Sequence, residues 1–281
     1  MFEEEIKTYE TLREAYHQQV TSRMNREDLK EYNEVLFSAH SCAIEGNSFS
    51  VNDTRELKEK GLGVVPQGKT LFEAFEMLDH FQAYEYLFSQ TGHPLSEELL
   101  KETHRILMQH TIAYKHPGAQ AGEYTDMDMA AGDTLFGDHE QLIARVPKLL
   151  LATQKALDAD QVHPLIIASR FHGFYEYLHP FRDGNGRLGR LFANYILHSK
   201  GHPIVIITNE RKNEYIDALR CIRTKGTDEY LIHFFFQTAI LRMQREIDEI
   251  LDVVGYINAP LSSHTGIRSS RSLSPRCRDS G

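Results

Sequence analysis

The chain has 281 residues, a formal net charge of −9, 41% hydrophobic residues and 25% charged residues. This composition is typical of folded globular proteins, and the length suits one large domain or two modest ones. The acidic balance argues against a general binder of nucleic acid or of anionic membranes, so we expect neither partner.

The lack of a membrane span and of a secretory signal, together with the cysteine pattern, predicts a cytoplasmic protein. No apolar run approaches the roughly 18 residues of a membrane span, and the acidic residues 1–5 are unlike a secretory signal. The cysteines Cys42, Cys221 and Cys277 are odd in number and far apart, which does not suggest a disulfide framework.

Apolar periodicity predicts helices through the first hundred residues. Asn25 is a favourable N-cap for a helix over 25–44, and Gly46-Asn47 forms its exit. A second helix is expected over 70–89, with a buried stripe of Phe72, Phe75, Leu78, Ala83 and Tyr86. Ser96 caps a third helix over 96–110.

The middle of the chain interrupts this helical pattern. Residues 117–137 contain four glycines and the β-compatible segments 124–125 and 134–136, which predict a loop or a short β-hairpin. A central helix follows from Pro164 to Pro180, with an apolar stripe formed by Ile167, Phe171, Phe174 and Leu178. Further helices are expected over 186–199, about 210–225 and 228–253.

The last residues have a different composition. Residues 259–281 are rich in Ser and Arg and are predicted to be disordered. We therefore divide the chain into an N-terminal helical region 1–94, a core domain 95–245, the end of the C-terminal helix 246–258 and this tail.

The segment 179–190, with the sequence HPFRDGNGRLGR, contains the groups that phosphate chemistry requires. Gly184 and Gly186 let the backbone bend so that amides point inward at the start of the next helix, where an anion such as phosphate binds well. Arg187 and Arg190 add guanidinium donors on one face of that helix.

Two further side chains of this segment suit catalysis. Asp183 lies beside the expected phosphate site and suits a Mg²⁺ ligand. His179 ends the preceding helix, and an imidazole exchanges protons near neutral pH, as a general base must. Gly-Asn-Gly alone is an ordinary turn, but the combination of base, carboxylate, glycines and arginines favours a functional site.

This segment resembles the Fic (Fido) motif, HPFx[DE]GNGRxxR, at every defined position. The flanking His163-Pro164 and Gly201-His202-Pro203 also agree with that family. The resemblance covers roughly 95–245 and implies an all-α, mainly helical Fic fold with a short β-hairpin flap at about 122–137.

Fic proteins typically transfer AMP from ATP to a Ser, Thr or Tyr hydroxyl of a target protein. The resemblance implies that His179 is the base, that Asp183 holds Mg²⁺, and that Phe181 fixes the loop in the core. Arg187 is implied to hold phosphates and to stabilise developing charge. The implied nucleotide-binding set is Gly184, Asn185, Gly186, Arg187, Arg190 and Tyr215, of which Tyr215 is explained almost as well as a core residue.

A second segment, SCAIEGN at 41–47, resembles the inhibitory motif (S/T)xxxE(G/N) of the same family. In that motif the glutamate reaches the second arginine, here Arg190, and occupies the group that would hold the ATP γ-phosphate. The implied regulatory residues are Ser41, Glu45, Gly46 and Asn47, at the end of an inhibitory helix over about 25–46. We therefore expect an auto-inhibited enzyme.

Several alternatives stay open at this stage. The fold could work in reverse as a deAMPylase or in both directions, with Glu45 positioning a water, or it could use another nucleotide donor. A non-catalytic binding module and a metal site formed by His172, Glu176 and His179 are more distant readings. An unknown target protein is expected to dock at the flap 122–137, and a homodimer is compatible with the region 1–94.

Overall fold

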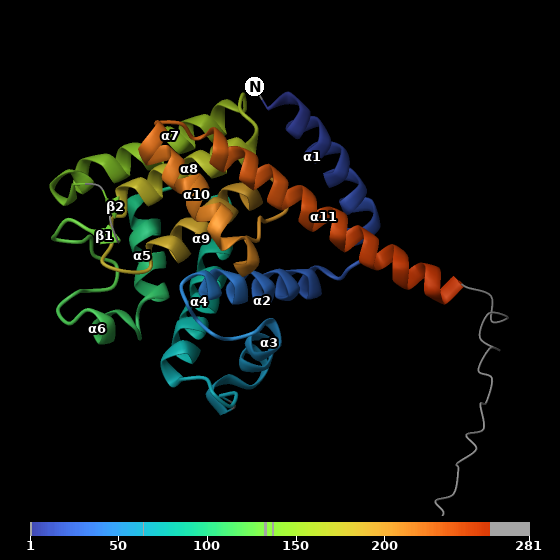
Figure 1. Cartoon of the computed structure of the whole chain (residues 1–281), viewed down its shortest axis with the longest axis horizontal. Helices are drawn as coiled ribbons and strands as arrows, with labels where there is room; N and C mark the ends of the chain where they lie inside the picture. The colour runs from blue at the N-terminus through green and yellow to red at the C-terminus, as the bar shows by residue number, and fades with distance from the viewer. Residues whose placement is uncertain (1, 64, 132–133, 137, 259–281) are drawn as a thin grey trace, which may run out of the picture.

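The computed structural model describes residues 2–63, 65–131, 134–136 and 138–258, and the mainly helical fold class is confirmed (Figure 1). The predicted tail 259–281 lies outside the described residues. The helices before the flap are α1 (Glu3–Tyr16), α2 (Arg26–Ile44), α3 (Val51–Lys60), α4 (Leu71–Ser89), α5 (Glu97–Leu107) and α6 (Ile112–Lys115). Those after it are α7 (Leu142–Ala159), α8 (Pro164–Leu178), α9 (Asn185–Ser199), α10 (Lys212–Lys225) and α11 (Glu229–Asn258).

Short turns of other helix types connect some of these elements. A π-helical segment, η1 (His17–Thr21), continues α1, and 3₁₀ turns follow α3 (η2, Gly61–Gly63), precede α7 (η3, His139–Gln141) and precede α10 (η4, Asn209–Arg211).

Side-chain caps explain where several helices begin. The Asn25 side chain accepts a hydrogen bond from Glu27 N, and that of Ser96 accepts one from Leu99 N, as the sequence predicts. A reciprocal capping box between Ser50 and Asp53 starts α3, which ends at the first glycine of the turn-rich stretch, Gly61.

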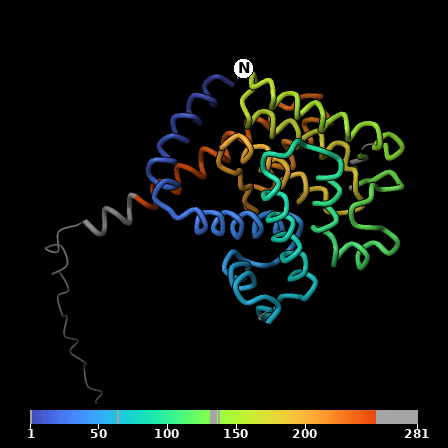
Figure 2. The backbone as a smooth tube through the Cα atoms, turned by 180° about the vertical axis from the view of Figure 1, so that it is seen from behind, coloured from blue at the N-terminus to red at the C-terminus, as the bar shows by residue number. Residues whose placement is uncertain are grey.

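Helices α8 and α9 form the centre of the molecule. Helices α7, α10 and α11 pack against α8, whereas α4 and α5 lie against α9. Helix α1 runs beside α11 in both views, so the first residues of the chain join the main core (Figures 1 and 2). A Cβ at Gly189 would lie only 2.8 Å from His172 Nδ1, so this glycine allows α9 its close approach to α8.

Two predicted buried stripes need correction. In α4, only Ala83 of the five predicted positions is fully buried, and the helix instead turns Glu76, Met77 and Asp79 inward. The tertiary contacts of α4 on both α2 and α9 override the simple apolar pattern. In α8, Phe174 is exposed, while the other three stripe residues are buried.

The predicted hairpin exists, but one of its predicted segments pairs elsewhere. Strands β1 (Ala130–Ala131) and β2 (Thr134–Leu135) form a two-stranded antiparallel ladder, the flap. Tyr124 forms a bridge with Phe181, and Thr125 N donates to Pro180 O over 2.8 Å. The segment before the hairpin therefore supports the loop 179–190.

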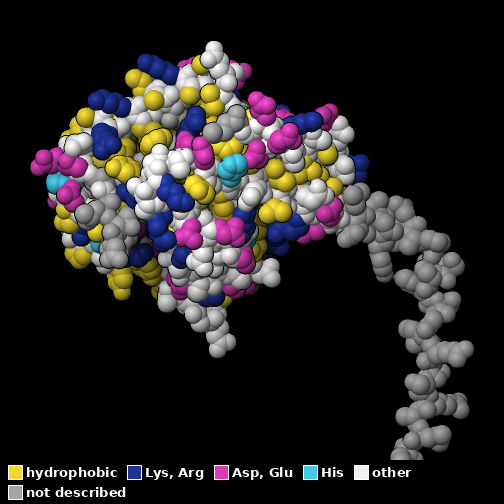
Figure 3. All heavy atoms as spheres, turned by 45° about the horizontal axis from the view of Figure 1, so that its top comes forward, with side chains coloured by type: hydrophobic (Ala, Val, Ile, Leu, Met, Phe, Trp, Pro, Cys, Tyr) yellow, Lys and Arg dark blue, Asp and Glu magenta, His cyan; other side chains and the backbone are white. Residues whose placement is uncertain are grey.

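The surface offers no broad field of a single charge on the face shown in Figure 3, where basic and acidic side chains are interspersed. Within the described ranges, no helix is both long and apolar enough to cross a bilayer.

Candidate active site

His179 lies at the point where α8 stops and the loop begins. Its backbone adopts the left-handed conformation (φ 49°), which is uncommon for a residue other than glycine, and its N–H caps Tyr175 O. The side chain is 19% exposed although its Nδ1 is buried, so another part of the ring reaches the solvent. The ring of Phe136, from the flap, stacks on the imidazole with centroids 3.8 Å apart.

The loop after His179 is clamped from within. The Asn185 carboxamide accepts from Phe181 N (3.0 Å) and donates to Phe181 O (2.7 Å). Phe181 is fully buried, as expected, and stacks on His104 at 3.7 Å. The side chain of Asn185 therefore fixes the loop, and its backbone amide is the first of helix α9.

His104 is a residue that sequence reasoning missed. Its Nδ1 accepts from Gly122 N (2.8 Å), so Nε2 carries the proton and donates to Asp183 O (3.0 Å). Burial lowers the pKa of His104 to about 4, which keeps the ring neutral. A lone histidine on an amphipathic helix gives no sequence signal for this contact between the flap base and the loop.

The start of α9 is shaped for an anion. Gly184 (φ 78°) precedes the helix, and no side chain caps its first amides. A Cβ at Gly184 would lie 2.6 Å from Met108 Sδ, and a Cβ at Gly186 would collide with Glu45 Oε1. A side chain at either position would thus displace the end of a flexible side chain, and Gly184 in addition has a backbone conformation that favours glycine.

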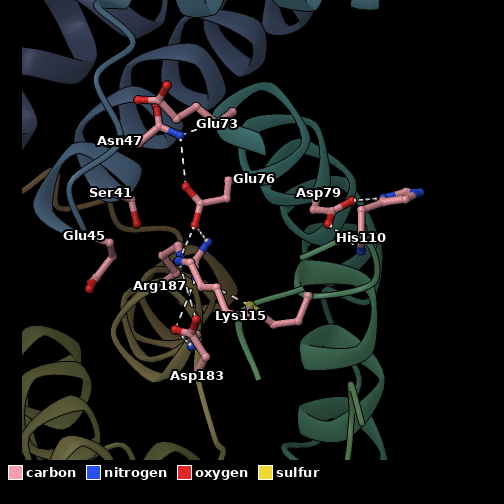
Figure 4. A network of polar contacts seen from close by, with 12 residues as sticks. Ser41, Glu45, Asn47, Glu73, Glu76, Asp79, His110, Lys115, Asp183 and Arg187 are labelled. Carbon is pink, nitrogen blue, oxygen red and sulfur yellow. Dashed lines mark hydrogen bonds and ion pairs between the residues drawn. The ribbon is translucent and has the colours of Figure 1, made fainter. Parts of the chain in front are cut away.

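Four charged side chains form a closed ring beside these amides (Figure 4). Arg187 Nη1 donates to Glu76 Oε1 (3.2 Å), and Arg187 Nη2 lies 3.5 Å from Asp183 Oδ1. Lys115 Nζ closes the ring, since it lies 2.9 Å from Glu76 Oε1 and 3.5 Å from Asp183 Oδ2. Glu76 and Lys115 belong to no motif, and both were missed by sequence reasoning.

The ring sets the charge state of Asp183. Burial alone would raise the pKa of Asp183, but the charges of Arg187 and Lys115 hold it below its ordinary value. Asp183 is thus an ionised, partly exposed carboxylate, which accepts from Gly184 N (2.6 Å) beside the amides at the start of α9. Such a donor suits a hard cation that keeps several waters and phosphate ligands.

Arg190 lies almost one turn beyond Arg187 and meets the end of α2. Its Nη2 donates to Glu45 Oε1 (2.7 Å) and to Ser41 O (2.8 Å), and its Nε donates to Ser41 Oγ (3.1 Å). The guanidinium is buried, and the Glu45 side chain is 36% exposed. The two segments singled out in the sequence therefore meet directly.

Gly46 and Asn47 turn the chain away from this contact. Gly46 has φ 100°, a conformation that favours glycine. Asn47 Nδ2 donates to Glu76 Oε2 (3.2 Å), so the turn after Glu45 also reaches the partner of Arg187 (Figure 4).

Tyr215 is buried, with its hydroxyl 2.6 Å from His172 Nε2 and 3.5 Å from Arg190 Nη1. It supports Arg190 from the core side. His172, Glu176 and His179 are not among the groups of the described residues whose donor atoms lie close enough together to hold one ion.

Comparison with known proteins identifies the family to which this site is similar. Residues 94–197 match the model of the Fic/DOC family. The chain carries a Fic/DOC family domain. It is 32% identical over 186 residues to a protein adenylyltransferase Fic of Nematostella vectensis, covering 64% of this chain and 41% of that protein. A relative of the same name in Culex quinquefasciatus is also 32% identical, over 188 residues. This chain therefore spans less than half the length of these curated relatives.

Solved structures agree with the Fic fold. Fic-1 from C. elegans superposes with a TM-score of 0.71 at 25% identity, covering 89% of this chain and 72% of that one. A Fic domain containing signaling protein from Bacteroides thetaiotaomicron superposes with a TM-score of 0.76 at 21% identity, covering 87% and 97% of the two chains. The second likeness shows the fold alone.

Proposed function

We propose that this protein transfers AMP from ATP to a hydroxyl of a target protein and that Glu45 inhibits the reaction. The observation that carries the proposal is the convergence of a base, uncapped helix amides and two arginines around the start of α9, with Glu45 on the second arginine. A module that only binds nucleotide has no need of a base at that place.

In the proposed reaction, His179 Nε2 takes the proton of the target hydroxyl. The hydroxyl oxygen forms a bond to the α-phosphorus while the bond from that phosphorus to the bridging oxygen breaks, and pyrophosphate leaves. The amides at the start of α9 and Arg187 stabilise the charge that develops on the phosphates.

The site also fits Mg²⁺ as an expected companion of ATP. Asp183 would hold it, since this carboxylate is ionised and partly exposed. A bound Mg²⁺ would neutralise phosphate charge. Lys115 and Arg187, which lie against Asp183, would then turn their donors towards phosphate oxygens.

Inhibition follows from the occupancy of Arg190. Glu45 and the Ser41 carbonyl together take Nη2, so that group is not offered to a γ-phosphate. The target would dock at the flap, whose Phe136 covers one face of the His179 ring. Docking would therefore displace or reorient Phe136 and uncover the base.

The test compares the natural protein with Glu45→Gly and with Glu45→Gly/His179→Ala, each incubated with ATP and Mg²⁺. Intact mass spectrometry reads the gain of one adenylyl group on the enzyme, as a substitute for the unknown target. We expect modification of Glu45→Gly alone. Modification that persists without His179 would contradict the role of the base.

Absence of modification in all three proteins would overturn AMP transfer. In that case, incubation with an adenylylated peptide tests the reverse reaction, and release of AMP by the natural protein would support a deAMPylase. Incubation with GTP or CTP tests for another nucleotide donor.

A further inference from the structure

Three buried polar atoms without a hydrogen-bond partner among the described residues lie along one helix. They are His172 Nδ1, Glu176 Oε1 and His179 Nδ1, on and at the end of α8. Buried polar atoms nearly always have partners, so such a group needs an explanation. Glu176 lies between the two imidazoles in sequence, and its Oε2 is 3.6 Å from His179 Nδ1.

The charge states make Glu176 an acceptor. Burial raises the pKa of Glu176, but the hydrogen bond with His179 and the charge interactions with His172, His179 and Arg190 more than offset this, so its pKa lies below the ordinary value. Burial lowers the pKa of His172 to about 4, and its other nitrogen is taken by Tyr215. Near neutral pH, His172 is therefore uncharged.

The elements around His179 restrict the ring but leave its protonation open. Phe136 stacks on one face of the ring. Arg223, from α10, donates to the backbone carbonyls of Glu176 and Tyr177 and lies over the Phe136 ring at 4.6 Å. These contacts hold the end of α8 and the plane of the imidazole. Neither Phe136 nor Arg223 determines whether Nδ1 or Nε2 of His179 carries the proton.

We propose that Glu176 is a positioning residue for His179: its carboxylate accepts the Nδ1 proton and thereby leaves the lone pair on Nε2. The buried nitrogen of the ring is Nδ1, so Nε2 is the one that can meet a target hydroxyl. A carboxylate behind a catalytic histidine fixes the same tautomer in serine hydrolases. The proposal rests on the proposed function, in which His179 is the base.

The distance of 3.6 Å is compatible with this arrangement. Catalytic hydrogen bonds are often long before substrate binds and shorten in the complex. When Nε2 takes the hydroxyl proton, the imidazolium that forms has Glu176 as its counter-ion, which stabilises the charge at the moment of transfer. Glu176 itself stays ionised throughout, and the proton leaves Nε2 for water afterwards.

The test uses the full chain in the Glu45→Gly background, with Glu176→Met as the main variant. Methionine has a similar length but no charge and accepts hydrogen bonds only weakly. Glu176→Gln is the conservative variant, because its carbonyl can still accept from Nδ1. The matched control is Asp79→Asn, which removes another buried carboxylate, 2.6 Å from His110 Nδ1 and apart from the Arg187 ring (Figure 4).

The first readout needs no activity. Ring ¹⁵N chemical shifts of ¹⁵N-histidine protein, assigned by the signal lost in His179→Asn, report the tautomer of His179. We expect a protonated Nδ1 in the parent and in Asp79→Asn, a mixture of tautomers in Glu176→Met, and an intermediate result in Glu176→Gln. An unchanged tautomer in Glu176→Met would overturn the proposal.

The second readout is the rate of AMP transfer. We expect a fall of about 10²-fold in kcat for Glu176→Met, with the KM for ATP within about twofold, because the carboxylate acts on the base and not on the nucleotide. Glu176→Gln should recover part of that loss. An equal loss in Glu176→Met and Asp79→Asn would assign Glu176 a merely structural role. If no variant transfers AMP, the proposed function fails, while the tautomer measurement still decides the role of Glu176.

Discussion

The two arginines of α9 each meet a glutamate from the N-terminal helices, and the two pairs are built differently. Arg187 pairs with Glu76, whose side chain is 7% exposed and is also bound by Lys115 and Asn47. Arg190 pairs with Glu45, whose side chain is 36% exposed and follows the last turn of a helix. Both guanidinium groups are buried, so the difference lies in the carboxylates.

This difference separates a fixed contact from a releasable one. Glu76 lies inside α4 and has three partners, so its removal leaves buried donors unpaired. Glu45 lies at the edge, where water can replace it and where the chain turns at Gly46. We therefore infer that Glu76 holds Arg187 in every state, whereas Glu45 leaves Arg190 when the enzyme is active.

The largest expected effect is on stability, from Glu76→Ala. This change leaves the buried Arg187 with the more distant carboxylate of Asp183, 3.5 Å away, and we expect the free energy of unfolding to fall by about 3–5 kcal/mol. The matched variant Glu45→Ala should lower it by about 1 kcal/mol, because its carboxylate is partly exposed. Chemical denaturation of both variants measures the difference, and equal losses would remove the distinction between the pairs.

The next effect is on the rate, from Glu45. Release of Arg190 in Glu45→Gly should raise the rate of AMP transfer by about 5- to 150-fold, which corresponds to a coupling of about 1–3 kcal/mol. Glu45→Gln keeps a hydrogen bond to Arg190 but loses the charge, so its rate should lie between those of the parent and Glu45→Gly. Initial rates with ATP at saturation measure this series, and a rate for Glu45→Gln at or below that of the parent would show that charge does not hold the pair.

The sequence predicts one of these pairs and not the other, for a physical reason. Glu45 is a poor fit to the negative end of a helix and stands in a recognisable motif, so its contact with Arg190 could be expected. Glu76 stands in a helix whose aromatic residues suggest a different buried face. The correct face depends on α2 and α9, which pack on α4 from distant parts of the chain.

The same contrast holds for the rest of the fold and site. The loop 179–190 could be located because its glycines, charges and flanking helices are local features. Residues such as His104 and Lys115 act across long sequence separations and leave no periodic signal. The Tyr124 segment looked like part of the hairpin because strand propensity does not specify a partner.

A smaller effect on the contact of Arg190 is expected from Ser41→Ala. It removes the Oγ that accepts from Arg190 Nε but keeps the Ser41 carbonyl contact. Loss of one such hydrogen bond is worth about 0.5–1.5 kcal/mol, so the rate of AMP transfer should rise by roughly 2- to 10-fold. Ser38→Ala is the control, because Ser38 lies on the same helix as Ser41, whereas its hydroxyl binds His80 of α4 and not Arg190. Equal rates for the two serine variants would place Ser41 outside the inhibitory contact.

The smallest effect concerns the turn that connects the two pairs. Glu73, at the start of α4, accepts from Ser48 N (2.8 Å) and from Thr70 N (2.9 Å), and so ties the chain after Asn47 to the helix that bears Glu76. Burial opposes ionisation, but these hydrogen bonds lower the pKa of Glu73 to about 2. Because the folded pKa lies below the unfolded value, this stabilisation is present above about pH 4.5 and is lost as the pH falls towards 2.

We therefore expect the free energy of unfolding to decrease from pH 5 to pH 2 less steeply in Glu73→Gln than in the parent. At neutral pH the loss should be about 0.5–1 kcal/mol, as for other helix caps. Denaturation series at several pH values measure the slope, with the exposed Glu56→Gln on α3 as control. The rate of AMP transfer by Glu73→Gln shows which arginine the turn after Glu45 supports. We expect a lower rate, because the buried contacts connect the turn to Arg187 through Asn47 and Glu76. A higher rate, with the pH dependence of the unfolding free energy unchanged, would mean that the turn acts on Arg190 through Glu45 alone.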